Sequence, residues 1–439
     1  MNRLFLLLYF MLFCVLVSCS GAGKSAEAGR AIDRTDSCKL DATNTYEVYI
    51  PARKSAVEKL PLLVILDAHG SGRFALDKFK QGANRYPAVL IASNLIKNGY
   101  EEYEGAIQTL IDDVRKKYPV SETVFMTGFS GGARMALDYG MQHSLNGMIM
   151  CGALANQDQI RTLRCPVISI SGMDDFNFME TAQYLFQEQS IPANLKIELT
   201  NDSHSWPDSV TLGNALGFLC LSGNNASKPS QQESQLKIYC QHQQERIKLL
   251  KQQGDYLKAA LVARYMSSTV PFNSDASFAS TYRDLKANKN YINQMNRLEK
   301  CLQTEISMRQ PYLEAFHTKD TLWWKNEIKT TEDKIRTEQD AYTTDMYRRI
   351  KGFLGIASYS LCKQAINQQN AEALTKILTI YRMLEPENPD MFYFSAFPYF
   401  WTGNTEITLS LLKKALKAGF SDRIQLNKDF PESITSNLK

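Results

Sequence analysis

Short apolar runs and segments of helical periodicity alternate along the first half of the chain. Leu62–Leu66 and Ala88–Ala92 are continuously apolar, as expected for strands buried on both faces of a sheet, and Val167–Ile170 is a further expected strand. Glu104–Lys117 and Gly131–Gln142 instead repeat apolar residues at helical spacing. The other expected elements are strands at Tyr46–Ile50, Thr123–Met126, Met148–Cys151 and Leu195–Leu199 and helices at Met179–Gln187 and Ser209–Cys220. This alternation predicts an α/β fold with a mostly parallel, doubly wound sheet.

The pattern changes after Leu221. Residues 223–232 lie in a polar stretch with Gly and Pro and predict a linker between an α/β domain, residues 44–222, and residues 233–439. β-branched runs vanish in the last range, so we expect an all-α domain there. Its clearest helices are Glu233–Lys251, Tyr256–Met266 and Tyr291–Met308, followed by a charged stretch near Asp320–Arg349.

The N-terminus has the pattern of an export signal over residues 1–19. A basic start precedes the apolar run Leu4–Leu16, whose length of about 13 residues is too short to span a bilayer comfortably. The run ends in Leu16–Cys19, which resembles the bacterial lipobox. The resemblance implies lipidation of Cys19 and a membrane-anchored protein of the bacterial envelope, facing the periplasm or the cell surface. Residues 20–43 are expected to be a tether, and an ordinary secretory signal with a chance cysteine is the alternative.

Composition and charge narrow the class of protein. Hydrophobic residues make up 44% and charged residues 22% of the 439 residues, which argues against disorder. The 50 basic and 46 acidic residues give a net charge of +4 without long runs, which argues against a nucleic-acid partner. Apart from Cys14 and Cys19, the cysteines are scattered without CxxC spacing. They predict neither a metal site nor a disulfide framework, and a single disulfide stays open.

A candidate nucleophile follows the predicted strand Thr123–Met126. Gly128–Gly132 has the pattern G-x-S-x-G, with Ser130 between a strand and a helix. A nucleophile elbow requires this context, because its serine sits at a strained corner where larger neighbours collide and where the helix N-terminus stabilises negative charge. The alternative is a tight strand-to-helix turn without chemistry.

A base and an orienting carboxylate follow Ser130 in the order that this elbow requires. His204 lies between the last predicted strand and the closing helix, and an exposed loop histidine is the alternative. Asp175, with Asp174 as second choice, lies on the loop after Val167–Ile170, where it can fix the histidine tautomer. A helix N-cap is the alternative for either aspartate. The chain order Ser, Asp, His is that of α/β-hydrolases.

The glycine-rich turn after Leu62–Leu66 predicts half of an oxyanion hole. We expect the backbone N–H of Gly131 to be one donor and that of Ser71, next to Gly70, to be the other. His69 in the same turn is expected to be a buried structural histidine.

A polar loop, Ser93–Gly99, follows the strand Ala88–Ala92. It is expected at the carboxyl edge of the sheet, where ligands bind. Asn94, together with Lys97 and Asn98, is a candidate substrate contact, and Asn-Gly turn chemistry without a ligand is the alternative.

These motifs make the sequence similar to the α/β-hydrolase superfamily, and more narrowly to the esterases grouped with polyhydroxybutyrate depolymerases and feruloyl or acetyl-xylan esterases. The resemblance covers about Tyr46–Leu221 and rests on His69-Gly70, Gly128–Gly132, Gly172–Asp175 and His204–Pro207. The sequence departs from the pattern at Asp67-Ala68 and at Ser203, where a glycine is usual. The resemblance implies an α/β-hydrolase fold and these roles: Ser130 as nucleophile, Asp175 as acid, His204 as base, Gly131 and Ser71 as oxyanion donors, and Trp206 as an aromatic substrate contact beside the histidine.

The end of the helical domain resembles tetratricopeptide repeats over about residues 355–422. Pro389–Asp422 fits a unit of about 34 residues, with aromatic and small residues at Phe392, Ala396, Tyr399, Gly403 and Ala415. Gly355–Asn388 fits more loosely. The resemblance implies a surface that binds a protein partner.

The sequence therefore predicts an envelope-anchored serine hydrolase that cleaves a carboxylic ester and needs no cofactor or metal. Acylated carbohydrates or aromatic esters as substrates are implied by the resemblance alone. A peptidase or thioesterase on the same triad is one alternative. A scaffold lipoprotein, with an inactive hydrolase domain and a partner on its helical domain, is another. A third alternative joins the enzyme and the helical domain: the helical domain caps the active site and selects the substrate.

Overall fold

The computed structural model describes residues 29–53, 55, 57–186, 191–222 and 229–438. The predicted export signal with Cys19 lies outside the described residues, and so do residues 223–228 of the predicted linker. In the part of the chain that is described, no helix is long and apolar enough to cross a membrane.

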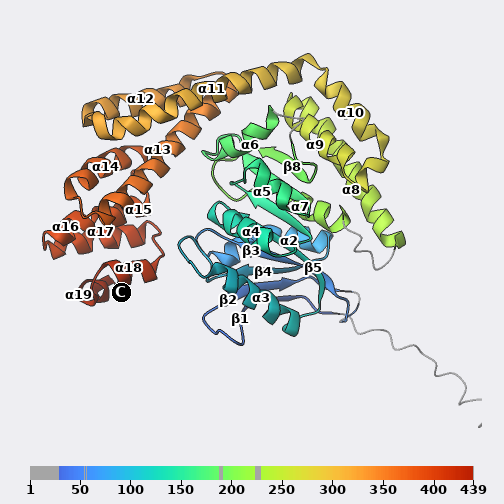
Figure 1. Ribbon diagram of the computed structural model, residues 1–439, viewed down its shortest axis with the longest axis horizontal. Coiled ribbons are helices and arrows are strands. Elements are labelled where there is room, and N and C mark those ends of the chain that lie inside the picture. The colour runs from blue at the N-terminus through green and yellow to red at the C-terminus, as the bar shows by residue number, and fades with distance from the viewer. Residues whose placement is uncertain (1–28, 54, 56, 187–190, 223–228, 439) are drawn as a thin grey trace, which may run out of the picture.

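One sheet of eight strands forms the centre of the first half of the chain, and every predicted strand belongs to it (Figure 1). Its order is β1 (Ile32–Ser37), β2 (Thr45–Ile50), β4 (Val89–Ser93), β3 (Leu60–Leu66), β5 (Val120–Phe129), β6 (Gly147–Cys151), β7 (Val167–Gly172) and β8 (Leu195–Thr200). β2 pairs antiparallel with both β1 and β4, and all pairs from β4 to β8 are parallel.

Helices cover both faces of the sheet, so the side chains of each strand divide between two hydrophobic cores. Leu62 and Val64 of β3 belong to the core with α3 (Tyr103–Lys117), α4 (Gly131–Gln142) and α6 (Phe178–Leu185). Leu63 and Ile65 belong to the core with α2 (Gly72–Arg85) and α7 (Ser209–Ser222). Helices cover both faces, which is why β3 and β4 carry the continuous apolar runs Leu62–Leu66 and Val89–Ala92. This strand order, with a strand–serine–helix corner after β5, is the predicted α/β-hydrolase fold.

The sequence pattern does not predict three elements of this domain, namely β1, α2 and the short α5 (Gln157–Thr162). β1 lies in the range expected to be a tether, and that expectation is wrong there. It pairs with β2 from Ile32 opposite Ile50 to Ser37 opposite Thr45. β1 is an edge strand without a buried residue, so its sequence IDRTDS carries no apolar run to reveal it.

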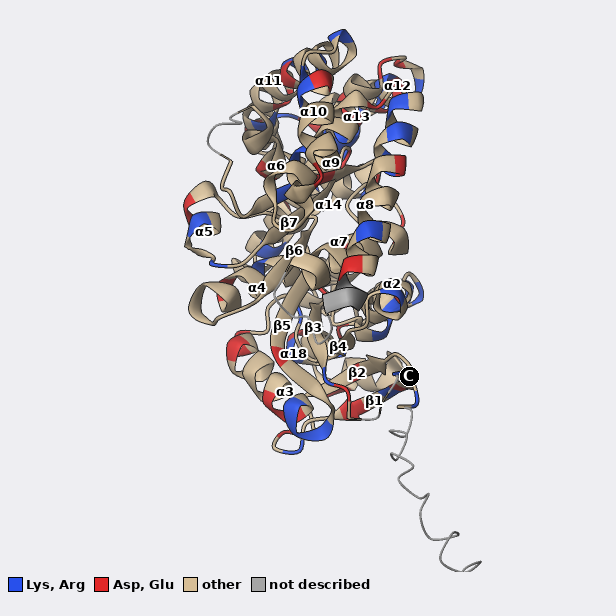
Figure 2. Ribbon diagram, turned by 90° about the vertical axis from the view of Figure 1, so that its right-hand side faces the viewer, with Lys and Arg blue, Asp and Glu red and all other residues tan. Residues whose placement is uncertain are grey.

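Helices make up the second half of the chain, as predicted. They form a crescent that leaves the sheet at α8, crosses at α11 and descends through α12 to α19 on the other side (Figure 1). They are α8 (Pro229–Gln252), α9 (Tyr256–Ser268), α10 (Ala276–Lys286), α11 (Lys289–Thr318), α12 (Thr321–Thr337), α13 (Ala341–Asn367), α14 (Ala371–Leu384), α15 (Pro389–Ser395), α16 (Phe397–Trp401), α17 (Thr405–Lys417), α18 (Arg423–Asp429) and α19 (Glu432–Thr435). Acidic and basic residues are interspersed on the helices that face the viewer in Figure 2. The tetratricopeptide-like character of residues 355–422 stays a prediction.

The first helices of this half share the cores of the α/β domain. Leu257 and Leu261 of α9 and Leu298 of α11 pack in the core that contains α3 and α4. Ala259 and Ala263 of α9 pack in the other core, with α2 and α7. The polar segment after α7 therefore separates two stretches of sequence, but it does not separate two hydrophobic cores.

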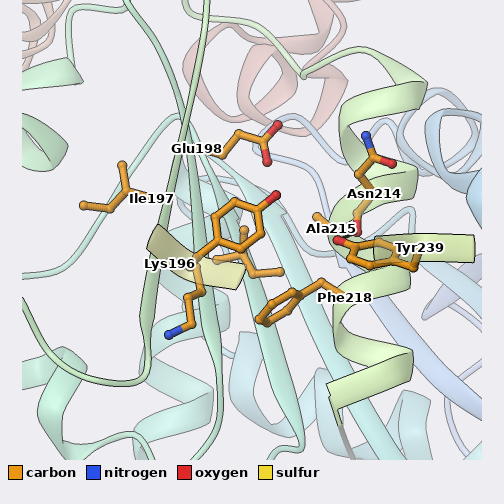
Figure 3. A pocket seen from close by; sticks show the side chains of 9 residues that line it. Lys196, Ile197, Glu198, Asn214, Ala215, Phe218 and Tyr239 are labelled. Carbon is orange, nitrogen blue, oxygen red and sulfur yellow. Dashed lines mark hydrogen bonds between the residues drawn. The ribbon is translucent and has the colours of Figure 1, made fainter. Parts of the chain in front are cut away.

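A small cavity marks this junction between β8, α7, α8 and α9 (Figure 3). Its volume of about 10 Å³ leaves room for one water molecule at most. Lys196 and Glu198 project from the same face of β8, and their charged ends point apart in Figure 3. The buried Glu198 forms an ion pair with the partly buried Arg246 of α8. The Lys196 ammonium donates to the carbonyl of Ala193 at 2.8 Å, and burial lowers its pKa to about 8. The Glu198–Arg246 pair thus fixes α8 to the last strand.

Two glycines set the distance between α2 and α7. A Cβ at Gly82 would lie 2.7 Å from the Cα of Gly213, so an alanine there forces the two helices apart. We expect Gly82→Ala to lower the free energy of unfolding by about 1–3 kcal/mol.

Gly105→Ala is the matched control, because a Cβ at this position of α3 meets no atom within 4 Å. It should raise the free energy of unfolding by about 0.5 kcal/mol, since alanine is the better helix former. Urea unfolding measures both variants, and equal stability of the two would contradict this account of the α2–α7 contact.

Candidate active site

Ser130 occupies the sharp corner between β5 and α4. Its backbone has φ 53° and ψ −117°, a conformation that non-glycine residues rarely adopt. The corner closes because its neighbours are glycines: a Cβ at Gly128 would lie 2.2 Å from the carbonyl carbon of Gly132. A Cβ at Gly132 would in turn lie 2.1 Å from the carbonyl oxygen of Leu66. The helix can therefore begin directly after the serine, and the Ser130 hydroxyl faces the carboxyl edge of the sheet.

The structure brings Ser130, His204 and Asp175 into one hydrogen-bonded line. Nε2 of His204 lies 2.9 Å from Oγ of Ser130, and Nδ1 lies 2.9 Å from Oδ1 of Asp175. An ionised carboxylate only accepts hydrogen bonds, so Nδ1–H of His204 donates to Asp175. Nε2 is then left to accept the hydrogen bond of the Ser130 hydroxyl. In this tautomer the imidazole can take a proton from the serine.

Asp175 lies on the acid loop, residues 173–177, between β7 and α6. Its side chain is 1% exposed, and its Oδ1 also accepts the backbone N–H of Asn177 at 2.8 Å. The N-cap of α6 is Asn177, so Asp175 is not the cap of that helix. Asp174 lies near Arg348 of α13, at 3.8 Å, and not against His204. Of the two predicted carboxylates, Asp175 is therefore the one that contacts the histidine.

The end of β7, from which the acid loop starts, touches the histidine loop, residues 201–207, through the backbone. A Cβ at Gly172 would lie 1.9 Å from the carbonyl oxygen of Asp202, so only glycine allows this approach. His204 is flanked by Phe129, with ring centroids 4.7 Å apart, and by Phe176, at 4.1 Å. Neither phenylalanine belongs to the site that the sequence predicts. Phe129 stands directly before Ser130 and could have been found there, but nothing in the sequence indicates that Phe176 meets the imidazole.

Asp67, the unusual residue of the turn after β3, organises that turn. Its carboxylate is buried and accepts the backbone N–H groups of His69 at 2.9 Å and Ser71 at 3.0 Å on Oδ1. Its Oδ2 accepts the indole N–H of Trp206 at 2.7 Å. The Asp67 carboxylate therefore links the turn after β3 to the histidine loop.

Three sequence-based expectations are wrong in this region. The Ser71 N–H is not a free oxyanion donor, because it already donates to Asp67. His69 is not buried, since its side chain is 75% exposed. Trp206 is 6% exposed and packs against Phe129, so it supports the turn from inside and does not line an open substrate surface. Gly131, the other expected donor, is the first residue of α4.

The three polar residues of the loop after β4 have three different surroundings, and only one of them lies beside the elbow. The Asn94 amide donates to the Glu47 carboxylate at 3.1 Å, so the candidate substrate contact is engaged by β2. Lys97 forms an ion pair of 2.9 Å with Asp422, the N-cap of α18. The exposed side chain of Asn98 lies over the elbow, where a Cβ at Gly131 would be 1.7 Å from its Oδ1. Asn98 is thus the residue of this loop that borders Ser130.

The described residues contain no group of three or more His, Cys, Asp or Glu side chains that could hold a metal ion. The seven cysteines among them are free thiols. Cys151 and Cys165 lie in the hydrophobic cores.

Comparisons with known proteins give structural matches only. No family model matches the chain, and no curated protein matches it. Est1E from Butyrivibrio proteoclasticus is 12% identical, with a TM-score of 0.34, over 42% of this chain and 95% of that one. An S-formylglutathione hydrolase from Agrobacterium tumefaciens is 12% identical, with a TM-score of 0.31, over 43% and 91%. A 2,6-dihydroxy-pseudo-oxynicotine hydrolase is 12% identical, with a TM-score of 0.35, over 45% and 70%. Likeness at this level does not bear on function, and the fold assignment rests on the strand order.

The strained backbone of Ser130 predicts an unusual gain in stability. Ser130→Gly relieves the strain of a left-handed conformation, whereas Ser130→Ala removes the same hydroxyl and keeps the Cβ. We expect Ser130→Gly to be more stable than Ser130→Ala by about 1 kcal/mol. Thermal and urea unfolding compare the two, and a less stable glycine variant would show that the corner is not strained.

The Asp67 carboxylate predicts a coupling between two loops. Asp67→Asn turns an amide N–H₂ toward the indole N–H of Trp206 or toward the two backbone N–H groups, so donors face donors. We expect the free energy of unfolding to fall by about 1–3 kcal/mol.

Trp206→Phe removes the indole donor and should reduce the further cost of Asp67→Asn, so a double-mutant cycle measures the coupling. Additive effects of the two substitutions would contradict the link between the loops.

Proposed function

We propose that this protein is a serine hydrolase that cleaves carboxylic esters through an acyl-enzyme intermediate. The hydrogen-bonded line from Ser130 through His204 to Asp175, built on a strained elbow of the α/β-hydrolase fold, carries the proposal. An exposed loop histidine or a capping aspartate needs no such alignment. Here three side chains from the ends of β5, β7 and β8 meet within hydrogen-bond distance.

The geometry supports a two-step reaction. Oγ of Ser130 attacks the ester carbonyl carbon while Nε2 of His204 takes the hydroxyl proton. Asp175, buried and bonded to Nδ1–H, stabilises the imidazolium that forms. The tetrahedral intermediate collapses, the C–O bond to the alcohol breaks, and His204 returns the proton to the leaving oxygen. Water then attacks the acyl group on Ser130 by the same route and releases the acid.

Negative charge on the carbonyl oxygen needs donors at the elbow. We assign one to the backbone N–H of Gly131, because this residue begins α4 and the helix N-terminus favours an anion. The N–H of Ser71 is committed to Asp67 and is left out of the assignment. The Asn98 side chain over Gly131 borders the same position and is the substrate contact that we favour from the loop after β4.

The ester bond is favoured by the resemblance of the motifs to esterases, and an acylated carbohydrate or an aromatic ester by that resemblance alone. The same triad supports thioester and peptide cleavage, so a substrate panel decides between them. The panel consists of p-nitrophenyl acetate and butyrate, the matched acyl thioesters and a peptide anilide.

We expect wild-type protein to hydrolyse the esters and Ser130→Ala or His204→Ala to lose about 10³-fold or more in kcat/KM. His143→Ala is the matched histidine control, because His143 pairs with Glu104 at 3.1 Å, away from the triad, and should keep wild-type activity. Ester hydrolysis that survives Ser130→Ala would overturn the proposal. Faster turnover of thioesters or the anilide, lost in the same two variants, would keep the triad and change the substrate class. If wild-type protein hydrolyses no substrate of the panel, the scaffold alternative is favoured.

A further inference from the structure

We infer that the helical half is part of the catalytic apparatus, because a buried ionic clamp on α11 and α13 positions the acid loop. The clamp consists of Glu305, Arg309 and Arg349. The inference rests on the proposed function, since it concerns the carboxylate that orients His204. It assigns Arg349 and Arg309 as positioning residues, which act through the loop and do not touch substrate.

The two arginines hold the backbone on both sides of Asp175. The guanidinium of Arg349 donates to the carbonyl oxygen of Met173. Nη2 of Arg309 donates to the carbonyl oxygen of Phe176 at 2.8 Å. These carbonyls belong to the residue before Asp174 and the residue after Asp175. Donors from the helical half therefore fix the ends of the dipeptide that supplies the catalytic carboxylate.

Glu305 holds both arginines in place. Its Oε2 accepts Nε of Arg349 at 2.7 Å, and its Oε1 accepts Nη2 of Arg309 at 2.5 Å. The side chains of Glu305 and Arg349 are 0% exposed. Burial of charges carries a large desolvation penalty, so an ion pair is a poor way to stabilise a helix contact that apolar residues could make. The charges instead fix the position of the loop, because each planar guanidinium donates N–H groups to particular carbonyl oxygens of that loop.

α13 also acts on the two aspartates and on the ring that covers His204. Arg348 draws Asp174 to the helical side, at 3.8 Å, while Asp175 turns to His204 at 2.9 Å. One turn further along, a Cβ at Gly352 would lie 3.3 Å from the Phe176 ring, and the centroid of that ring lies 4.1 Å from that of the His204 imidazole. The same helix therefore separates the two neighbouring carboxylates and backs the phenylalanine.

The test uses the full chain and two clamp variants. Arg309→Met removes one donor to the loop and leaves the Glu305–Arg349 pair intact. Glu305→Gln/Arg349→Met removes the two fully buried charges together and leaves Arg309, whose side chain is 21% exposed, without its carboxylate partner. Lys351→Met is the matched control, because Lys351 of the same helix pairs at 2.7 Å with Glu332 on α12, at the surface.

We expect each clamp variant to lower kcat for the best ester by about 10²-fold with little change in KM, as for a displaced catalytic group. Lys351→Met should equal wild type. Folding is checked by circular dichroism and thermal unfolding, and if the double variant does not fold, Arg309→Met alone carries the test. Folded clamp variants with kcat within about twofold of wild type would overturn the inference.

A second readout does not depend on turnover. The proton on Nδ1 of His204 that is shared with Asp175 should give a far-downfield proton resonance in wild type, which His204→Gln lacks. The clamp variants should lose or shift this resonance, and Lys351→Met should keep it. An unchanged resonance in folded clamp variants would overturn the inference even if wild type proved inactive on every substrate. If wild type is inactive but its resonance changes in the clamp variants, the proposed function is contradicted, and the inference that the clamp positions the acid loop is supported.

Discussion

Backbone segments meet at the carboxyl edge of the sheet more closely than any side chain allows, and the site depends on this approach. Gly128 and Gly132 let α4 turn back over β5, and Gly172 lets the end of β7, where the acid loop starts, approach the histidine loop. With these contacts made, the ends of β5, β7 and β8 place a hydroxyl, a carboxylate and an imidazole in one line. Part of the free energy gained from the two hydrophobic cores offsets the strain stored at Ser130.

Buried polar groups then fix what the backbone brings together. Asp67 ties the turn after β3 to Trp206, and the clamp of Glu305, Arg309 and Arg349 holds the acid loop from α11 and α13 of the helical half. Each group is costly to bury unless its hydrogen bonds are made, so each permits few arrangements of its neighbours. The α/β domain and the helical half thus both contribute to the orientation of His204, although all three residues of the line lie in the first half of the chain.

The sequence predicts most of this architecture because the relevant signals are local. Strands buried on both faces are apolar runs, and the elbow around Ser130 is a short motif in a definite context. Features that depend on contacts between residues far apart in the sequence leave no local pattern, so the sequence does not predict them. β1 is a polar edge strand that is recognisable only once β2 is beside it. The engagement of the Ser71 N–H by Asp67 is a feature of a folded turn. The arginines of the clamp lie more than a hundred residues after Asp175. In the sequence they cannot be told apart from the charged residues on the solvent-exposed faces of the same helices.

The most direct measurement is the reaction of the intact protein with a fluorophosphonate, followed by mass-spectrometric mapping of the modified residue. Such a probe bonds covalently only to a serine activated by a neighbouring base. The account predicts a phosphonyl adduct on Ser130, formed in wild type and absent in His204→Ala. A folded wild-type protein that stays unmodified, or that carries its adduct on another serine, would contradict it.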